Sequence, residues 1–286
     1  MSPGRIRTAL AYREIPASRT TGAVAMAAAA VLATSIGLVL SSGGRTAEAK
    51  SKPPAPVPAR QAAQLRPAAR PVSRPASRPV SRPAVPASTE LATVLATAPR
   101  YAAPGRLGAG AVPARWYERP SVLPVIATRP GWVRVRLAQR PDGSTAWLPA
   151  GDVTLSSTPY RIVVDLATTR LALYDHGRLV FSAPAGVGAE DDPTPTGEFF
   201  VAFNEPPPEP NPGYGPFIIV TSDHSQAISD WEGSGDAVIG IHGPLGEDGL
   251  IGTTGARISH GCVRLHLQSL ERLAQVPPGT PIDVIG

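Results

Sequence analysis

One short segment of the chain combines a lone cysteine with residues that suit a nucleophile. Cys262 is the only cysteine, so it cannot form a disulfide within the chain. It follows Ser259, His260 and Gly261, and His242 lies upstream. A thiol attacks a carbonyl carbon as its thiolate, which a nearby histidine can generate by removing the proton. The segment therefore predicts nucleophilic catalysis by Cys262, with His242 and His260 as the two candidate bases.

The two histidines differ in how they would reach the sulfur. His242 ends an apolar run at 238–241 that is typical of a buried strand. A fold can bring a histidine at a strand end to a distant cysteine. His260 lies two residues before Cys262, where close neighbours seldom reach a good geometry for proton transfer. We therefore predict that His242 is the base.

Two further residues of this segment would serve such a reaction. Gly261 gives the backbone the freedom to turn its own N–H, and that of Cys262, toward a developing oxyanion. Arg264 carries a planar fork that binds carboxylates through two hydrogen bonds. The sequence therefore predicts an oxyanion site at Gly261 and a carboxylate site at Arg264.

A zinc site is an alternative use of the same residues, because imidazole and thiolate are zinc ligands. Its ligands would be His242, His260, Cys262 and His266. However, His260 and Cys262 are unusually close in sequence for two ligands, and no Cys-x-x-Cys pair accompanies them. We therefore expect no metal and no organic cofactor.

Short strands separated by turns are expected to position these residues. Apolar patterns indicate strands at 161–166, 170–174, 179–181, 198–203, 217–220, 238–242 and 281–285. Leu267, Leu270 and Leu273 give an apolar face to a helix at 266–274. Many short strands with one or two short helices predict a mainly β fold for residues 159–286, a β-sandwich or partly open barrel.

A smaller β unit is expected before this domain, at residues 99–156. Residues 131–137 alternate apolar and charged side chains as a half-buried strand does, Asp142-Gly143 indicates a turn, and residues 145–149 return as the partner strand. The stretch resembles bacterial SH3-like modules, which often bind wall peptides or sugars. A subdomain that only buttresses its neighbour fits the pattern equally well.

The basic character of the chain belongs to its N-terminal part. The formal charge is +5, but residues 1–90 hold 13 of the 27 Lys and Arg and 3 of the 22 Asp and Glu. This leaves 14 basic and 19 acidic residues for the rest of the chain. A folded part with an acidic balance argues against nucleic acid as the partner.

Residues 1–98 fall into two segments with different predictions. An uncharged apolar run at about 22–40 follows four arginines, which predicts a membrane anchor with residues 1–20 in the cytoplasm. Ala47-Glu48-Ala49 equally suits cleavage of a signal peptide spanning residues 1–49. Residues 50–98, rich in Pro, Ala and Arg, predict a disordered, extended linker. In both cases we expect the folded part to be exported into the cell envelope.

The spacing of the reactive residues carries a resemblance to one family. His242-Gly243 and Ser259-His260-Gly261-Cys262-Val263-Arg264 resemble the signature of the L,D-transpeptidase (YkuD-type) catalytic domain. Thr194-Pro195-Thr196-Gly197 is similar to a turn of the same family. The resemblance covers about Tyr160 to Gly286.

This resemblance implies a reaction on the peptide stems of peptidoglycan. Cys262 would attack the amide between the third and fourth residues of a tetrapeptide stem and release D-alanine. The thioester would then pass to the side-chain amine of a second stem as a 3→3 crosslink. His242 would be the general base and acid, oriented by a backbone carbonyl such as that of Gly243, while Ser259 and His260 shape the site. Carbapenems, which are β-lactams, would acylate the cysteine.

Other acceptors for the same thioester remain open. Water would make the protein an L,D-carboxypeptidase, and a different amine would make it a wall-attachment transferase. An inactive wall-binding module is a further alternative, which the intact Cys262, His242 and Gly261 disfavour.

Three further expectations concern the surroundings of the site. Residues 160–286 hold 16 acidic and 6 basic residues, a balance expected to attract an amine acceptor, while Arg264 and Arg257 would receive donor carboxylates. The proline-rich segment 205–216 is expected to form a loop near the active site. We expect the protein to be a monomer.

Overall fold

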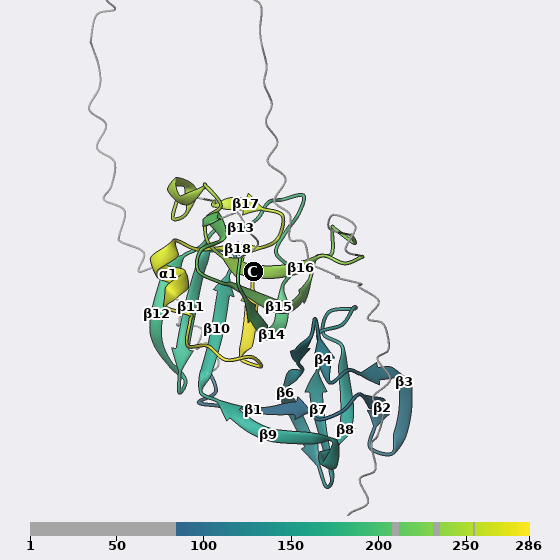
Figure 1. Ribbon diagram of the computed structural model, residues 1–286. Helices are drawn as coiled ribbons and strands as arrows, with labels where there is room; N and C mark the ends of the chain where they lie inside the picture. The colour runs from purple at the N-terminus through teal and green to yellow at the C-terminus, as the bar shows by residue number, and fades with distance from the viewer. Residues whose placement is uncertain (1–83, 208–211, 231–234, 254) are drawn as a thin grey trace, which may run out of the picture. The chain divides into compact units, whose positions relative to one another are not determined.

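The computed structural model describes residues 84–286 apart from 208–211, 231–234 and 254 (Figure 1). From Ala84 onward these residues belong to one compact unit. The predicted anchor or signal peptide, and the predicted linker as far as residue 83, lie outside the described residues. Within the described ranges, no helix is long and apolar enough to cross a membrane.

The first part of the described chain is an antiparallel sheet of seven strands in the order β3-β2-β8-β7-β6-β1-β9. Its strands are β1 (Thr89–Val94), β2 (Ala98–Ala103), β3 (Arg106–Val112), β6 (Val122–Arg129), β7 (Trp132–Arg136), β8 (Thr145–Pro149) and β9 (Val153–Thr158). A two-stranded hairpin, β4 (Arg115–Trp116) with β5 (Arg119–Pro120), and the 3-10 turn η1 (Ala150–Asp152) complete it.

The second part is an eight-stranded sheet in the order β12-β11-β10-β19-β14-β15-β16-β18. Its strands are β10 (Tyr160–Asp165), β11 (Arg170–Asp175), β12 (Arg178–Pro184), β14 (Gly197–Glu205), β15 (Ile218–His224), β16 (Val238–His242), β18 (Val263–Arg264) and β19 (Pro281–Ile285). The short pair β13 (Val187–Gly188) and β17 (Arg257–Ser259), the 3-10 turns η2 (Pro212–Tyr214) and η3 (Asp248–Leu250), and the helix α1 (Leu267–Glu271) lie around it.

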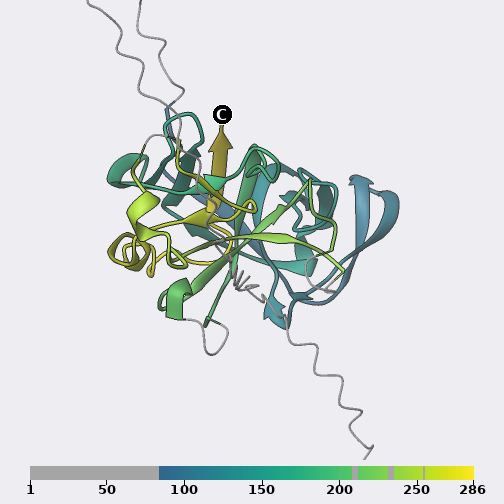
Figure 2. The same ribbon diagram turned by 90° about the horizontal axis from the view of Figure 1, so that it is seen from above.

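The second sheet curls into a half-barrel, as predicted for a mainly β fold (Figure 1). The C-terminal strand β19 runs inside this sheet, between β10 and β14. It leads to the C-terminus marked in Figure 2. It pairs in parallel with β10 and antiparallel with β14. The end of the chain is therefore part of the core that supports the site.

Strand β14 is buried on both faces, which explains its unbroken apolar sequence. Phe199 packs into the core of the second sheet, whereas its neighbour Phe200 packs into the core of the first. Successive side chains of a strand point to opposite faces, so both faces need apolar residues here. Strand β14 of the second sheet thus also packs against the core of the first sheet.

The first sheet begins earlier than predicted. Residues 89–94 were expected to belong to the linker, but they form β1, which pairs with both β6 and β9. Ala92 and Val94 are buried in the core of this sheet. The apolar residues of β1 are few and directly follow the proline-rich segment. They indicate a strand only when the partner strands β6 and β9 are known. The predicted boundary at 99 was therefore wrong.

The hairpin predicted around Asp142-Gly143 is confirmed. Strands β7 and β8 pair antiparallel on either side of this turn. Val133 and Val135 are buried while Arg134 between them is exposed. The likeness to SH3-like modules stays a prediction.

The predicted helix at 266–274 is shorter than expected. Helix α1 ends at Glu271, and the next residues continue in turns whose N–H groups bond three residues back, as at Leu273 and Ala274. Leu270 and Leu273 are buried, but Leu267 is 43% exposed. An apolar spacing of three suits the three residues per turn of such 3-10 turns better than a regular α-helix.

Candidate active site

Strand pairing brings the two predicted catalytic residues together. Strand β16 runs parallel to β18, with Ile241 opposite Val263 and His242 opposite Arg264. The Leu265 N–H continues the contact by donating to the His242 carbonyl at 2.9 Å. Cys262 immediately precedes β18, so the parallel pairing places it beside Gly240, two residues before His242 on the neighbouring strand.

Gly240 lies next to both Cys262 and His242. Its N–H donates to the Cys262 Sγ at 3.4 Å. A methyl group added at Gly240 would lie 3.8 Å from Cδ2 of His242 and 3.3 Å from Cγ2 of Ile218. Residues 240 and 242 share one face of β16 because side chains alternate along a strand. A glycine here therefore leaves room beside the His242 ring on this face of β16.

The histidine is held in one tautomer. His242 is 2% exposed, and its Nδ1 lies 2.8 Å from the Gly243 carbonyl oxygen. A carbonyl can only accept, so Nδ1 carries the proton and the neutral ring keeps its lone pair on Nε2. The Gly243 carbonyl is thus placed where it can orient the ring. Nε2 is thus the atom that can take a proton from the thiol.

Burial favours the neutral form of both reactive groups. Burial lowers the pKa of His242 to about 4, opposed by the Gly243 hydrogen bond and reinforced by the positive Arg264. Cys262 is half-buried as a residue, and burial of its thiol raises the pKa, although the Gly240 N–H and Arg264 act in the other direction. A preformed thiolate–imidazolium pair is therefore disfavoured, and the proton must move during attack.

The turn before the cysteine is fixed by its own hydrogen bonds. The Ser259 hydroxyl donates to the Cys262 carbonyl at 2.6 Å and accepts from the Gly261 N–H at 3.2 Å. Gly261 has φ +113, and a Cβ there would lie 2.7 Å from Cδ1 of Ile239. Only glycine suits this position, because both the conformation and the space exclude a side chain.

This geometry corrects one prediction. The Gly261 N–H was expected to point toward an oxyanion, but in the structure it is bonded to the Ser259 hydroxyl. The Gly261 carbonyl accepts from the Thr194 hydroxyl at 2.7 Å, and Thr194 in turn accepts from the Gly188 N–H at 2.8 Å. Ser259 therefore holds the turn before Cys262, and the Gly261 N–H is already bonded within that turn.

His260 and the two arginines lie differently from expectation. The His260 side chain is 62% exposed, with its Nε2 3.8 Å from the Asp192 carboxylate. Arg264 is largely buried and pairs with Glu247, and Arg257 donates to the Leu166 carbonyl at 3.3 Å. A substrate carboxylate would have to replace these contacts to reach either guanidinium.

Tyr214 is a site residue that the sequence did not indicate. Its ring meets the His242 ring edge to face, with centroids 4.9 Å apart. Its carbonyl accepts from the Gly243 N–H at 2.7 Å, and the Gly213 carbonyl accepts from the Leu245 N–H at 3.0 Å. The described part of the predicted loop 205–216 thus contacts the segment that carries the base, as expected.

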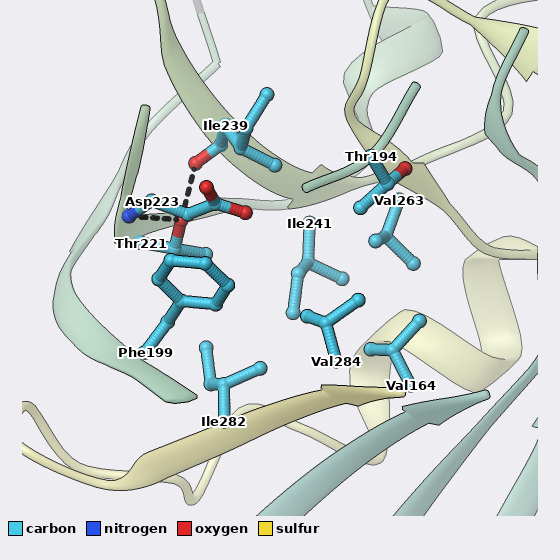
Figure 3. Close-up of a pocket in the computed structure, with 10 residues that line it drawn as sticks. All are labelled: Val164, Thr194, Phe199, Thr221, Asp223, Ile239, Ile241, Val263, Ile282 and Val284. Atoms are coloured by element: carbon cyan, nitrogen blue, oxygen red, sulfur yellow. Dashed lines mark hydrogen bonds between the residues drawn. The ribbon is translucent and has the colours of Figure 1, made fainter. Parts of the chain in front are cut away.

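Asp223 is a buried carboxyl near the nucleophile. It lines a small cavity whose other walls are apolar residues with Thr194 and Thr221 (Figure 3). Burial, together with the neighbouring Asp142, raises its pKa well above the usual range. Its charged form would in turn raise the pKa of Cys262. The sequence signal for this residue was a carboxylate shortly after the apolar run 218–220, which is typical of a buried strand.

A metal site is not formed by the described residues. Among them, no group of three or more His, Cys, Asp or Glu side chains is placed to hold an ion.

The comparison with protein families identifies this region. The model of the YkuD L,D-transpeptidase catalytic domain matches residues 159–284. Residues 159–284 are thus similar to L,D-transpeptidase catalytic domains. The match contains every residue of the Cys262 and His242 site described above.

Curated relatives of the L,D-transpeptidase domain come from bacilli. L,D-transpeptidase YkuD of Bacillus licheniformis is 35% identical over 127 residues, which cover 44% of this chain and 66% of that protein. L,D-transpeptidase YqjB of Bacillus subtilis is 29% identical over 146 residues, covering 49% and 77%. The chain thus spans slightly less than two thirds of the length of the YkuD protein.

Solved structures of L,D-transpeptidases also match. An L,D-transpeptidase from Mycobacterium smegmatis is 20% identical, with a TM-score of 0.35, and the match covers 54% of this chain and 91% of that one. The catalytic domain of the E. faecium L,D-transpeptidase is 23% identical, with a TM-score of 0.31, covering 44% and 96%.

Proposed function

We propose that this protein is a cysteine-dependent L,D-transpeptidase that joins peptidoglycan stems through 3→3 crosslinks. The observation that carries the proposal is the position of Gly240, whose N–H reaches the Cys262 sulfur beside the His242 ring. A thiol and an imidazole with a free Nε2 are the two groups that acyl transfer needs. The family of residues 159–284 supports the same reaction.

The reaction begins with formation of a thioester. His242 Nε2 takes the thiol proton as the Cys262 sulfur attacks the carbonyl carbon of the amide between stem residues three and four. The tetrahedral intermediate collapses, the carbon–nitrogen bond breaks, and His242 gives the proton to the leaving amine of D-alanine. The neutral resting pair suits this cycle, because one proton is taken up and returned without a stable ion pair.

Transfer to the acceptor repeats these steps in reverse order. The side-chain amine of a second stem attacks the thioester and loses a proton to His242. The carbon–sulfur bond breaks, an amide forms, and the proton returns to the thiol. A donor carboxylate would compete with Glu247 for Arg264, and the acidic balance of residues 160–286 would favour approach of an amine.

The site of action we propose is the cell envelope outside the cytoplasm. This part of the proposal rests on the apolar run at 22–40 and the proline-rich segment that follows it. The apolar run would direct the chain out of the cytoplasm, and the proline-rich segment would extend the folded part toward the peptidoglycan.

The test of the proposed chemistry is the intact mass of the protein after incubation with a carbapenem. Wild type, Cys262→Ala and His242→Ala are compared at equal concentration. We expect a stoichiometric adduct on the wild type, no adduct on Cys262→Ala, and acylation slowed by about 100-fold or more in His242→Ala. A folded wild type that forms no adduct would overturn the assignment of Cys262 as an activated nucleophile.

The acceptor is tested with defined stems. A tetrapeptide donor and an amine-bearing acceptor stem are incubated with the wild type, and the products are separated by mass. A crosslinked dimer with release of D-alanine supports the transpeptidase. A shortened tripeptide alone would identify water as the acceptor and make the protein an L,D-carboxypeptidase.

A further inference from the structure

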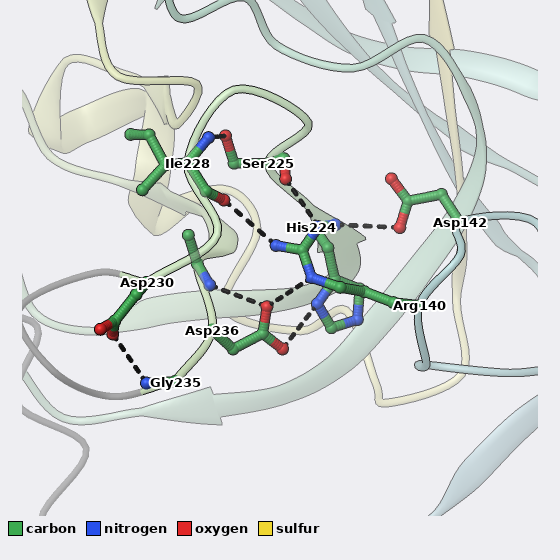
Figure 4. A network of polar contacts seen from close by, with 9 residues as sticks. Arg140, Asp142, His224, Ser225, Ile228, Asp230, Gly235 and Asp236 are labelled. Carbon is green, nitrogen blue, oxygen red and sulfur yellow. Dashed lines mark hydrogen bonds and ion pairs between the residues drawn. The ribbon is translucent and has the colours of Figure 1, made fainter.

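Arg140 belongs to the first sheet, yet its guanidinium contacts the loop that joins β15 to β16 (Figure 4). It lies in the turn between β7 and β8. Its Nε donates to Asp236 Oδ1 at 2.9 Å, Nη1 donates to the Ser225 carbonyl at 2.8 Å, and Nη2 donates to the Ile228 carbonyl at 3.2 Å. One planar fork thus binds three acceptors on one loop.

These three acceptors lie at both ends of the loop. Ser225 directly follows β15, whereas Asp236 comes just before β16. The Asp236 carboxylate also accepts from the Ala237 N–H at 2.8 Å and lies 2.9 Å from His224 Nδ1. The Ser225 N–H donates to the Ala237 carbonyl at 2.8 Å. Arg140 and Asp236 therefore tie the end of β15 to the beginning of β16.

The same turn of the first sheet makes a second contact with β15. Asp142, two residues after Arg140, accepts from the His224 N–H at 3.2 Å. His224 is 2% exposed, and its ring centroid lies 6.1 Å from that of Trp116 in the β4–β5 hairpin. The last residue of β15 is thus fixed by groups from the first sheet.

The pairing of β15 with β16 is irregular at this place. Val220 lies opposite Gly240, but His224 lies opposite Val238, so residues of β15 between them are bulged. A bulged pairing leaves the register to be fixed by local contacts, and a slip by one residue would turn every side chain to the other face. The register of β16 decides where Gly240 and His242 stand relative to Cys262.

We propose that Arg140 is a positioning residue of the active site: by tying both ends of the β15–β16 loop, it fixes the pairing that presents Gly240 and His242 to Cys262. The first sheet would then take part in catalysis as a support for the nucleophile, in addition to any binding of the wall.

The test measures alkylation of Cys262 by iodoacetamide as a function of pH in the full chain, followed by intact mass. Iodoacetamide is not a stem peptide, so the result does not depend on the proposed transpeptidase activity. Wild type is compared with Arg140→Ala and Arg140→Lys. Arg136→Ala is the matched control, because Arg136 also lies in the first sheet and pairs with the second sheet, through Glu198 on β14.

We expect Arg140→Ala to raise the pH midpoint of alkylation by about one unit and to slow alkylation at pH 8 by about tenfold, because the thiolate loses the Gly240 N–H. Arg140→Lys should lie between this variant and the wild type, since a lysine keeps the charge without the fork. Arg136→Ala should stay within about twofold of the wild type.

Two results would overturn the proposal. The first is an Arg140→Ala protein whose midpoint is unchanged or lowered. The second is an Arg136→Ala protein with the same upward shift, which would mean that contact between the sheets in general, rather than Arg140, supports the site. If Arg140→Ala does not fold, Arg140→Lys and Arg140→Gln are judged by the same criteria.

Discussion

Replacing His242 with glutamine is expected to remove a loss of stability that the wild type suffers at acidic pH. Burial is the main reason why the pKa of this imidazole falls from 6.5 to about 4 on folding. The unfolded chain takes up a proton as the pH falls below about 6.5, whereas the folded protein resists it until about pH 4. The stability that the neutral imidazole contributes is therefore complete above pH 6.5 and is lost as the pH falls toward 4.

The size of this effect follows from the two pKa values. Each pH unit between 6.5 and about 4 costs about 1.4 kcal/mol, so the free energy of unfolding falls by about 3 kcal/mol across this interval. Below about pH 4 this histidine contributes no further change, because both states then bind the proton. An effect of this size is a large share of the free energy of unfolding of a typical protein, which is roughly 5–15 kcal/mol.

The assay is urea unfolding of the full chain at pH 7, 5.5 and 4, with the wild type and His242→Gln side by side. Carboxyl groups titrate in both proteins, so the difference between the two curves isolates the imidazole. At pH 7 the variant should be the less stable protein, and by pH 4 its relative stability should have risen by about 3 kcal/mol. His176→Gln is the matched control, since the His176 side chain is 71% exposed.

Parallel curves would refute the reasoning. If the stability gap between wild type and His242→Gln changed by less than about 0.5 kcal/mol from pH 7 to 4, the imidazole would have the same affinity for protons in both states. The lowering of the His242 pKa by burial would then have to be abandoned.

Three more predictions concern the same site. Because burial raises the thiol pKa, the rate of Cys262 alkylation in the wild type should still be rising above pH 9, and a plateau below pH 8 would indicate a thiolate–imidazolium pair instead. Gly240→Ala places a methyl group 3.3 Å from Ile218 and 3.8 Å from the His242 ring, so acylation by a carbapenem should slow by about tenfold or more while circular dichroism stays unchanged; an unaltered rate would contradict the role of this glycine. Tyr214→Phe keeps the ring against His242 and should acylate within about threefold of the wild type, whereas Tyr214→Ala should be slower by about tenfold; equal rates for the two variants would show that the ring contact is dispensable.

Local patterns predicted the strands well because each strand here has a simple environment. Residues 131–137 alternate because one face of β7 is buried, and residues 198–203 are apolar throughout because β14 is buried on both faces. The same reasoning failed at β1, where the apolar residues become interpretable only with their partners β6 and β9.

The reactive pair itself was already determined by the sequence. A single cysteine in a Ser-His-Gly-Cys turn, with a histidine at the end of an apolar strand, predicts which atoms react, because candidate nucleophiles and bases are recognised by residue type. Only the tertiary structure decided the protonation and the hydrogen-bond partners of those atoms. Burial and contacts between segments determine four features: the tautomer of His242, the neutral form of the thiol, the bond from the Gly261 N–H to Ser259, and the pairing of Arg264 with Glu247.

Arg140 is the clearest case. It lies in a turn of the first sheet but contacts the loop that leads to β16 in the second sheet, and no neighbouring residue in the chain indicates this contact. Strand register and burial are properties of the assembled sheet, so they cannot be read from any one segment.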